Sequence, residues 1–335
     1  MRSTKLILVE GIPGTGKSTT AQFIDRGFRS HCANVSWYHE DSSVQPVRLF
    51  FDPTRHVPWS VYLNEAEDQW RKFVLSFSTS DSVAVFDASI LQNHVRSLLL
   101  FGCKADVIAD LVLRIESIIR PLSPSWIYLK PDSIEDNFRR IGRARGEQLL
   151  ELWVQSQSRF PYADQAKLTG SAGFIEFWNE VELVAQGIFD RLTISKTQIN
   201  VTGSNWNELL DSVERFFNFD LNHQLATKLN FDELAGIYSS SIDNSQTEVV
   251  VELNNDSIAV ICANPTFDPV SGPFVCFHKA QLIPVDLDHF SVLGWPHTVT
   301  LIRDDNLQIS GLNVRANAIG WPLANQIFRR KERKI

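Results

Sequence analysis

The stretch LILVEGIPGTGKSTTAQF, residues 6–23, joins an apolar run to a glycine-rich turn and then to a helix-like pattern. The run from Leu6 to Glu10 is typical of a strand that is buried on both faces of a parallel sheet. The following residues, GIPGTGKS at 11–18, fit the pattern GxxxxGK[ST] at every required position, between a strand and a helix. This order predicts a phosphate-binding loop at the start of an α/β domain.

The residue types of this loop suit the phosphates of a nucleotide. Glycines let the backbone curl so that successive N–H groups face the phosphates, and the positive end of the following helix dipole adds to the attraction. We expect Lys17 to reach the β- and γ-phosphates and the Ser18 hydroxyl to complete a magnesium shell. The predicted cradle consists of Gly11, Pro13, Gly14, Thr15, Gly16, Lys17, Ser18 and Thr19. ATP and Mg²⁺ are therefore the expected cofactors.

Strands and helices alternate over the first two-thirds of the chain. After residues 6–10, further strands are expected at 35–39, 83–86, 126–130 and 198–201, with helical patterns between them. Such alternation implies parallel strands joined by right-handed crossovers. The predicted fold class is α/β, a P-loop NTPase parallel sheet with helices on both faces.

The pattern changes near residue 222. From about residue 231, short segments of alternating apolar and polar residues are separated by turn residues such as NND and RDDN. This is typical of an antiparallel sheet or a small barrel. We therefore expect two domains, a P-loop domain at 1–222 and a smaller, barrel-like antiparallel β domain at 223–335.

Bulk properties exclude some classes of protein. The chain has 335 residues, which favours two domains, and its net charge of −7 argues against a general nucleic-acid binder. The four cysteines form no CxxC pair, the N-terminus leaves no room for a leader, and no apolar run approaches the ~20 residues needed to cross a bilayer. We expect a cytoplasmic protein with no membrane or nucleic-acid partner, and the sequence does not indicate its oligomeric state.

Acidic residues follow two of the predicted strands. Glu40 and Asp41 end the segment WYHED, and Asp87 closes the strand VAVF. Because the carboxyl ends of parallel strands meet beside the phosphate loop, these carboxylates should form the acidic side of a site. The alternatives are a solvated turn for Glu40 and Asp41, and a strand-end cap for Asp87.

A cluster of arginines occupies the segment NFRRIGRARGE, residues 137–147. Arg139 and Arg143 would share one helix face, where like charges repel each other. Either an anionic ligand offsets this charge, or the helix is solvated and paired with its own acidic residues. The basic residues are Arg139, Arg140, Arg143 and Arg145, and the nearby acidic residues are Glu135, Asp136 and Glu147.

With these motifs in place, the segment from Leu6 to about Phe219 resembles P-loop kinases of the nucleoside and nucleotide kinase group, which also includes antibiotic and shikimate phosphotransferases. The resemblance implies that Glu40, ahead of Asp41, accepts the proton of the attacking hydroxyl. It also implies that Asp87 holds the magnesium shell or serves as a base. Ala88 departs from the family, in which an arginine is common at this position.

The same resemblance makes the arginine segment a lid that closes over ATP, with Arg139, Arg143 and Arg145 as catalytic residues. The C-terminal part resembles the small lipocalin-like β domain appended to some penicillin-binding-protein-like hydrolases. That resemblance rests on Gly236-Ile237-Tyr238, Leu282 with Pro284, Phe290, and Asp304-Asp305. No serine–lysine pair for hydrolase chemistry is evident, so this domain would be a binding, lid or oligomerisation module.

The expected activity is ATP-dependent transfer of the γ-phosphate to a hydroxyl or phosphate of a small molecule. The alternative is an NTP-hydrolysing switch, or a nucleotide-binding regulatory protein whose β domain binds a partner or ligand. The chain shows neither an Asp-Glu pair after the strand VAVF nor a guanine-specifying NKxD motif. These features favour the kinase.

Overall fold

The computed structural model describes most of the chain in two compact units. The first comprises Met1–Glu40 and Gln45–Asn222, and the second comprises Asp41–Val44 and His223–Ile335. The described residues are 4–31, 34–40, 42, 44–49, 58–145, 147–201, 206–218, 231–242, 245–253, 259–263, 280–285, 287–295, 297–316 and 326–331.

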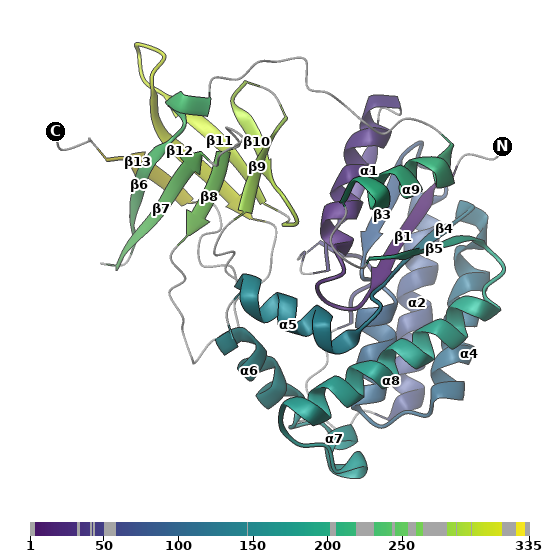
Figure 1. Cartoon of the computed structure of the whole chain (residues 1–335). Coiled ribbons are helices and arrows are strands. Elements are labelled where there is room, and N and C mark those ends of the chain that lie inside the picture. Colours follow the sequence, from purple (N-terminus) through teal and green to yellow (C-terminus); the bar gives the residue numbers. More distant parts are fainter. Residues whose placement is uncertain are drawn as a thin grey trace. The chain divides into compact units, whose positions relative to one another are not determined.

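The first unit is built on a parallel sheet with the strand order β2-β3-β1-β4-β5 (Figure 1). Its strands are β1 (Leu6–Gly11), β2 (Val35–Tyr38), β3 (Val83–Asp87), β4 (Ser125–Lys130) and β5 (Ser195–Asn200). Val9 pairs with Asp87, and Gly11 pairs with Leu129. The end of β1, where the phosphate loop begins, therefore lies between the ends of β3 and β4.

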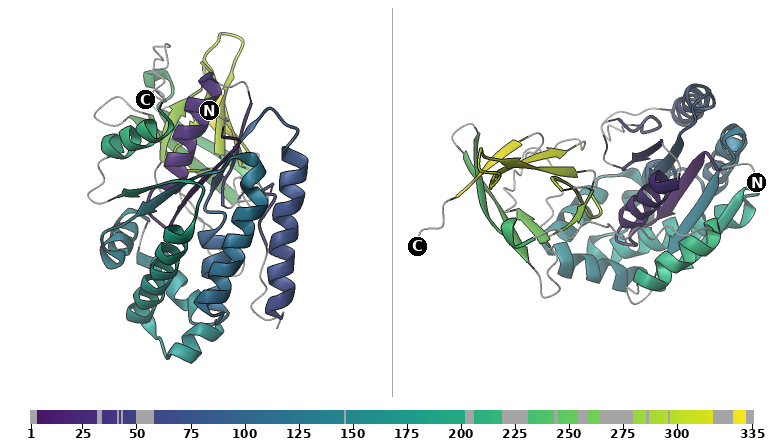
Figure 2. Two further views of the ribbon diagram at one scale, coloured as in Figure 1. Left: turned by 90° about the vertical axis from the view of Figure 1, so that its right-hand side faces the viewer. Right: turned by 90° about the horizontal axis from the view of Figure 1, so that it is seen from above.

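Helices cover both faces of this sheet (Figures 1 and 2). One face carries α1 (Lys17–His31) and α9 (Trp206–Phe217), and the other carries α2 (Trp59–Phe77), α4 (Ala105–Ile119) and α8 (Gly170–Arg191). Ile7 and Val9 join the first core, whereas Leu6 and Leu8 join the second. Burial on both sides is why β1 has no alternation of polar and apolar residues. The predicted α/β fold class is confirmed.

Shorter helical segments complete this unit. A π-helix, η1, follows β3 after a short turn, and the region that contains the arginine cluster forms two consecutive helices. The segments are η1 (Leu91–Arg96), α3 (Ser97–Leu100), η2 (Arg120–Leu122), α5 (Ile134–Arg145), α6 (Glu147–Gln157) and α7 (Pro161–Ala166).

The second unit is a closed antiparallel barrel, preceded by the single turn η3 (Phe231–Glu233), as the alternating pattern predicted (Figure 2). Its order is β10-β11-β12-β13-β6-β7-β8-β9, closed by pairing of β9 with β10. The strands are β6 (Gly236–Ile242), β7 (Ser245–Leu253), β8 (Ala259–Ala263), β9 (Ala280–Pro284), β10 (His289–Val292), β11 (His297–Arg303), β12 (Ile309–Ala316) and β13 (Gln326–Arg330).

Large side chains such as Tyr238, Phe290 and Phe328 fill the core of the barrel. The likeness to a lipocalin-like domain stays a prediction, since the antiparallel closure is a property that many barrels share. Within the described residues of the whole chain, no helix combines the length and apolar character that a membrane span requires.

Candidate functional site

The phosphate loop has the conformation that its glycines predict. Gly14 and Gly16 have φ angles of +82° and +91°, a region that side chains with a Cβ rarely adopt. A Cβ at Gly16 would also lie 2.4 Å from the ring of Trp206, and one at Gly14 would lie 2.5 Å from Ile141. Both positions therefore require glycine for two independent reasons.

Lys17 is held against the loop that precedes it. Its Nζ donates a hydrogen bond of 3.0 Å to the carbonyl oxygen of Ile12, and the Thr15 hydroxyl donates one of 2.9 Å to the same oxygen. The Lys17 side chain is almost wholly buried although it carries a charge. A buried ammonium beside a curled glycine loop is an arrangement suited to binding an anion.

Asp87 supplies a buried carboxyl group at the end of β3. The side chain is 0% exposed, and neither oxygen has a hydrogen-bond partner among the described residues. Burial raises the pKa of Asp87 well above its usual value, the Glu40 carboxylate raises it further, and the Lys17 ammonium opposes the rise. A buried carboxyl group without a hydrogen-bond partner suits a bound cation better than a structural cap.

His39 lies between two of the predicted site residues, although sequence reasoning assigned it no role. Its Nε2 is 3.3 Å from the Ser18 hydroxyl oxygen and 3.7 Å from Oδ2 of Asp87. A serine–histidine–aspartate relay would need a different ring nitrogen for each partner, so this geometry is not that of a hydrolase triad. Instead, His39 brings together the two residues predicted to hold magnesium.

Glu40 follows β2, and its Oε2 atom is buried with no hydrogen-bond partner within the described residues. Its charge acts on Asp87 and also on Arg96, so the carboxylate lies within electrostatic reach of both. Asp41, the other predicted candidate for the base, lies outside the described residues. The choice between Glu40 and Asp41 stays a prediction.

Glu10, the residue before the phosphate loop, was not predicted as part of the site. Its carboxylate accepts hydrogen bonds from the Ser89 hydroxyl and from the backbone N–H groups of Ile90 and Leu91, at 3.1, 2.7 and 3.0 Å. Burial raises the pKa of Glu10 to about 7 against these hydrogen bonds. Glu10 thus ties the end of β1 to the start of η1.

The arginines of α5 differ in their surroundings. Arg139 forms ion pairs with Glu135 and Asp136 on its own helix, as the solvated alternative predicts. Arg143 is exposed, and the side chain of Arg145 lies outside the described part of the chain. None of this tests their role with a nucleotide, so the catalytic assignment of these three arginines stays a prediction.

A different residue of α5, Asn137, reaches the phosphate loop. Nδ2 of Asn137 donates a hydrogen bond of 2.7 Å to the carbonyl oxygen of Pro13, and Nη2 of Arg140 donates one of 2.8 Å to Oδ1 of Asn137. Asn137 is 2% exposed. Sequence reasoning noted Arg140 only as a member of the cluster and missed Asn137, because an asparagine beside four arginines carries no distinguishing signal.

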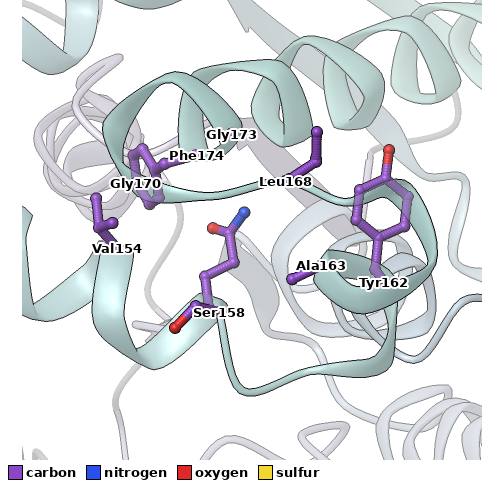
Figure 3. Close-up of a pocket in the computed structure, with 9 residues that line it drawn as sticks. Val154, Ser158, Tyr162, Ala163, Leu168, Gly170, Gly173 and Phe174 are labelled. Atoms are coloured by element: carbon purple, nitrogen blue, oxygen red, sulfur yellow. The ribbon is translucent and has the colours of Figure 1, made fainter.

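The described residues contain no group of three or more His, Cys, Asp or Glu side chains arranged to hold a metal by themselves. Mg²⁺ is commonly held by one or two protein oxygens together with phosphate oxygens and water. Ser18 and the unpartnered Asp87 oxygens fit that pattern. The recess of Figure 3, lined by residues such as Val154, Leu168 and Phe174, lies among α6, α7 and α8 and brings no comparable polar set together.

No protein-family model matches the sequence, and no curated protein does. Among solved structures, the chain is similar to thymidylate kinase from Ehrlichia chaffeensis, with a TM-score of 0.40 and 12% identity over 65% of this chain and 100% of that one. It is also similar to thymidylate kinase from Candida albicans, with a TM-score of 0.40 and 12% identity over 64% of this chain and 91% of that one. At this low identity and TM-score, the similarity does not identify a substrate for this protein.

Proposed function

We propose that this protein is an ATP-dependent kinase that transfers the γ-phosphoryl group of ATP to a hydroxyl, or a phosphate, of a small molecule. The observation that carries the proposal is the gathering of Lys17, Ser18 and Asp87 at the carboxyl ends of the parallel strands. His39 links Ser18 to Asp87, and the charges of Lys17 and Glu40 both act on Asp87. This edge is where doubly wound sheets bind their ligands.

The loop and its lysine would bind the nucleotide phosphates. Backbone N–H groups of residues 14–19 would hold them, and Lys17 would exchange its bond to Ile12 for the β- and γ-oxygens. Ser18 and Asp87 would hold Mg²⁺, which neutralises charge on the phosphates when it is bound. Asp87 must be ionised for this role, and the proximity of a cation would lower its raised pKa.

The remaining roles concern the acceptor. Glu40, or Asp41, would take the proton of the attacking hydroxyl as the new P–O bond forms and the bond from the γ-phosphorus to the β–γ bridging oxygen breaks, with ADP as the leaving group. Arg139, Arg143 and Arg145 would offset the charge of the transferring group and exclude water once α5 closes over it. Arg139 would have to leave Glu135 and Asp136 to do so.

The test is ATP consumption by the full chain, with Mg²⁺, against a library of metabolites and antibiotics. We expect consumption to rise with one class of acceptor and to form a phosphorylated product. Lys17→Ala should abolish transfer, whereas Lys72→Ala on the exposed face of α2 should not change it. Release of phosphate to water at a rate that no acceptor changes would instead support the NTPase switch.

A further inference from the structure

Arg96 is the last residue of the π-helix η1, which begins four residues after Asp87. Its guanidinium carbon lies 5.8 Å from the centre of the Trp178 ring. No hydrogen bond or ion pair joins this guanidinium to another described residue, although the side chain is largely shielded from water. π-helical turns are rare and are often found at functional sites. An arginine in such a turn that has no hydrogen bond or ion pair with a described residue is therefore a candidate for binding a ligand.

Glu40 carries an opposite charge that acts on Arg96, but the two side chains form no ion pair with each other. Burial lowers the pKa of the Arg96 guanidinium and the Glu40 carboxylate opposes this, so the two groups lie within each other's field. Yet Oε2 of Glu40 has no hydrogen-bond partner among the described residues. A shielded carboxylate and guanidinium normally form a direct pair, since leaving each uncompensated is costly. As far as the described residues go, both groups are available to a third group.

Two amide groups nearby are also unsatisfied. Gln45 is 7% exposed and its Nε2 has no partner within the described residues, and the same holds for Nε2 of Gln92 in η1. Oε1 of Gln45 accepts a hydrogen bond of 3.4 Å from Asn93, the neighbour of Gln92. A buried donor without a partner is costly, so two of them at the π-helix that carries Arg96 need an explanation.

The π-helix that carries Gln92 and Arg96 is fixed at two points. Glu10 binds its first N–H groups, and His94 at its centre is joined to α2. The Trp70 indole N–H donates to Nε2 of His94 at 3.0 Å, so Nδ1 carries the ring proton and donates to the Tyr62 hydroxyl at 2.8 Å. A segment held in this way can present Arg96 in one orientation, as a binding site requires.

We propose that Arg96, Gln45 and Gln92 form the acceptor subsite of the kinase, and that the acceptor carries an anionic group bound by Arg96. This inference rests on the proposed function. The groups left without a partner are the two amide nitrogens and the guanidinium, which are donors, so they call for a ligand rich in oxygen acceptors, whereas Glu40 calls for a hydroxyl donor. An acceptor with a negative group near its reacting hydroxyl satisfies both demands, and a neutral one leaves the Arg96 charge uncompensated.

Inorganic phosphate can serve as the probe of this subsite. The full chain is first saturated with Mg²⁺ and a non-hydrolysable ATP analogue, so that the phosphate loop no longer competes for the probe. Phosphate binding is then measured by calorimetry for the wild type, for Arg96→Gln and for Arg96→Lys. Arg114→Gln, which removes an exposed arginine of α4 that pairs with Glu67 of α2, is the matched control.

We expect phosphate to bind the loaded wild type and Arg114→Gln equally. Arg96→Gln should bind it at least about tenfold more weakly, and Arg96→Lys should recover part of the loss. Affinity for the ATP analogue should be unchanged, which also shows that the variants fold. Equal phosphate binding by wild type and Arg96→Gln, or none by the loaded wild type, would overturn the subsite. Failure of the analogue itself to bind the wild type would overturn the proposed function instead.

Discussion

The indole ring of Trp206, at the start of α9, lies directly against the Cα of Gly16 in the phosphate loop. On its other side the loop meets Ile141 of α5, which contacts Gly14. The loop is therefore enclosed by two helices that lie far from it in the sequence. Its shape depends on these neighbours as well as on its own glycines.

Gly16→Ala should abolish nucleotide binding, because the new methyl group meets the Trp206 ring at 2.4 Å and φ is +91°. The double variant Gly16→Ala, Trp206→Ala should recover binding only in part, since the backbone cost of about 1–2 kcal/mol remains. Binding of a fluorescent ATP analogue would measure both effects.

Gly187→Ala is the matched control, because Gly187 lies within α8 and no heavy atom lies within 4 Å of the new Cβ. It should bind nucleotide normally and gain roughly 0.5–1 kcal/mol of stability from the helix preference of alanine. Full nucleotide binding by Gly16→Ala would show that the loop can move away from Trp206.

Asn137 should matter to activity although no sequence motif marks it. Asn137→Asp keeps the acceptor for Arg140 but loses the donor to the Pro13 carbonyl, whereas Asn137→Ala loses both contacts. We expect each to lower the free energy of unfolding by roughly 1–3 kcal/mol and to raise the KM for ATP. Steady-state kinetics at varied ATP would check this, and unchanged KM values would mean that Asn137 only supports α5.

Site residues placed by a local motif could be predicted from the sequence, whereas residues that reach the site from far along the chain were missed. The phosphate loop and the acidic strand ends were predictable, because a motif and a strand pattern place Lys17, Ser18 and Asp87 locally. Asn137 and Trp206 reach the loop only through the tertiary fold. Arg96 was missed because no motif marks its segment, and only the π-helical turn and the unpartnered neighbours distinguish it.

The two units should be separable. Each has its own buried core, one on the parallel sheet and one inside the barrel. A fragment of residues 1–222 should therefore be folded, unfold cooperatively in thermal scans and bind ATP with the affinity of the full chain. An aggregating fragment, or one that binds ATP more than about tenfold more weakly, would mean that the barrel completes the first unit.

The buried His94 should make stability depend on pH. Burial lowers the pKa of His94 to about 4, and the ring accepts a hydrogen bond from Trp70 that a protonated ring could not accept. In the unfolded chain the ring takes up a proton near pH 6.5. Between these values the unfolded state binds more protons than the folded state, so the free energy of unfolding falls as the pH falls.

Glu10 has the opposite effect on the free energy of unfolding over much of the same pH range. Its pKa is raised to about 7 in the folded protein, so its protonation favours the folded state as the pH falls toward the unfolded value. The wild type alone therefore cannot reveal the contribution of His94. The useful comparison is with His94→Gln, whose amide can still accept from Trp70 and donate to Tyr62 but does not titrate.

We expect His94→Gln to be less stable than the wild type at pH 7, and this difference to shrink by about 3 kcal/mol between pH 7 and pH 4. The figure follows from the gap between the unfolded pKa and the folded value of about 4 for this fully buried ring. Urea unfolding of both proteins at half-unit pH steps would measure it, with Glu10 and Asp87 common to both and therefore cancelling. Stability curves that stay parallel from pH 7 to pH 4 would show that His94 takes up its proton at the same pH in the folded as in the unfolded chain, and that the Trp70–His94–Tyr62 network does not hold the ring neutral.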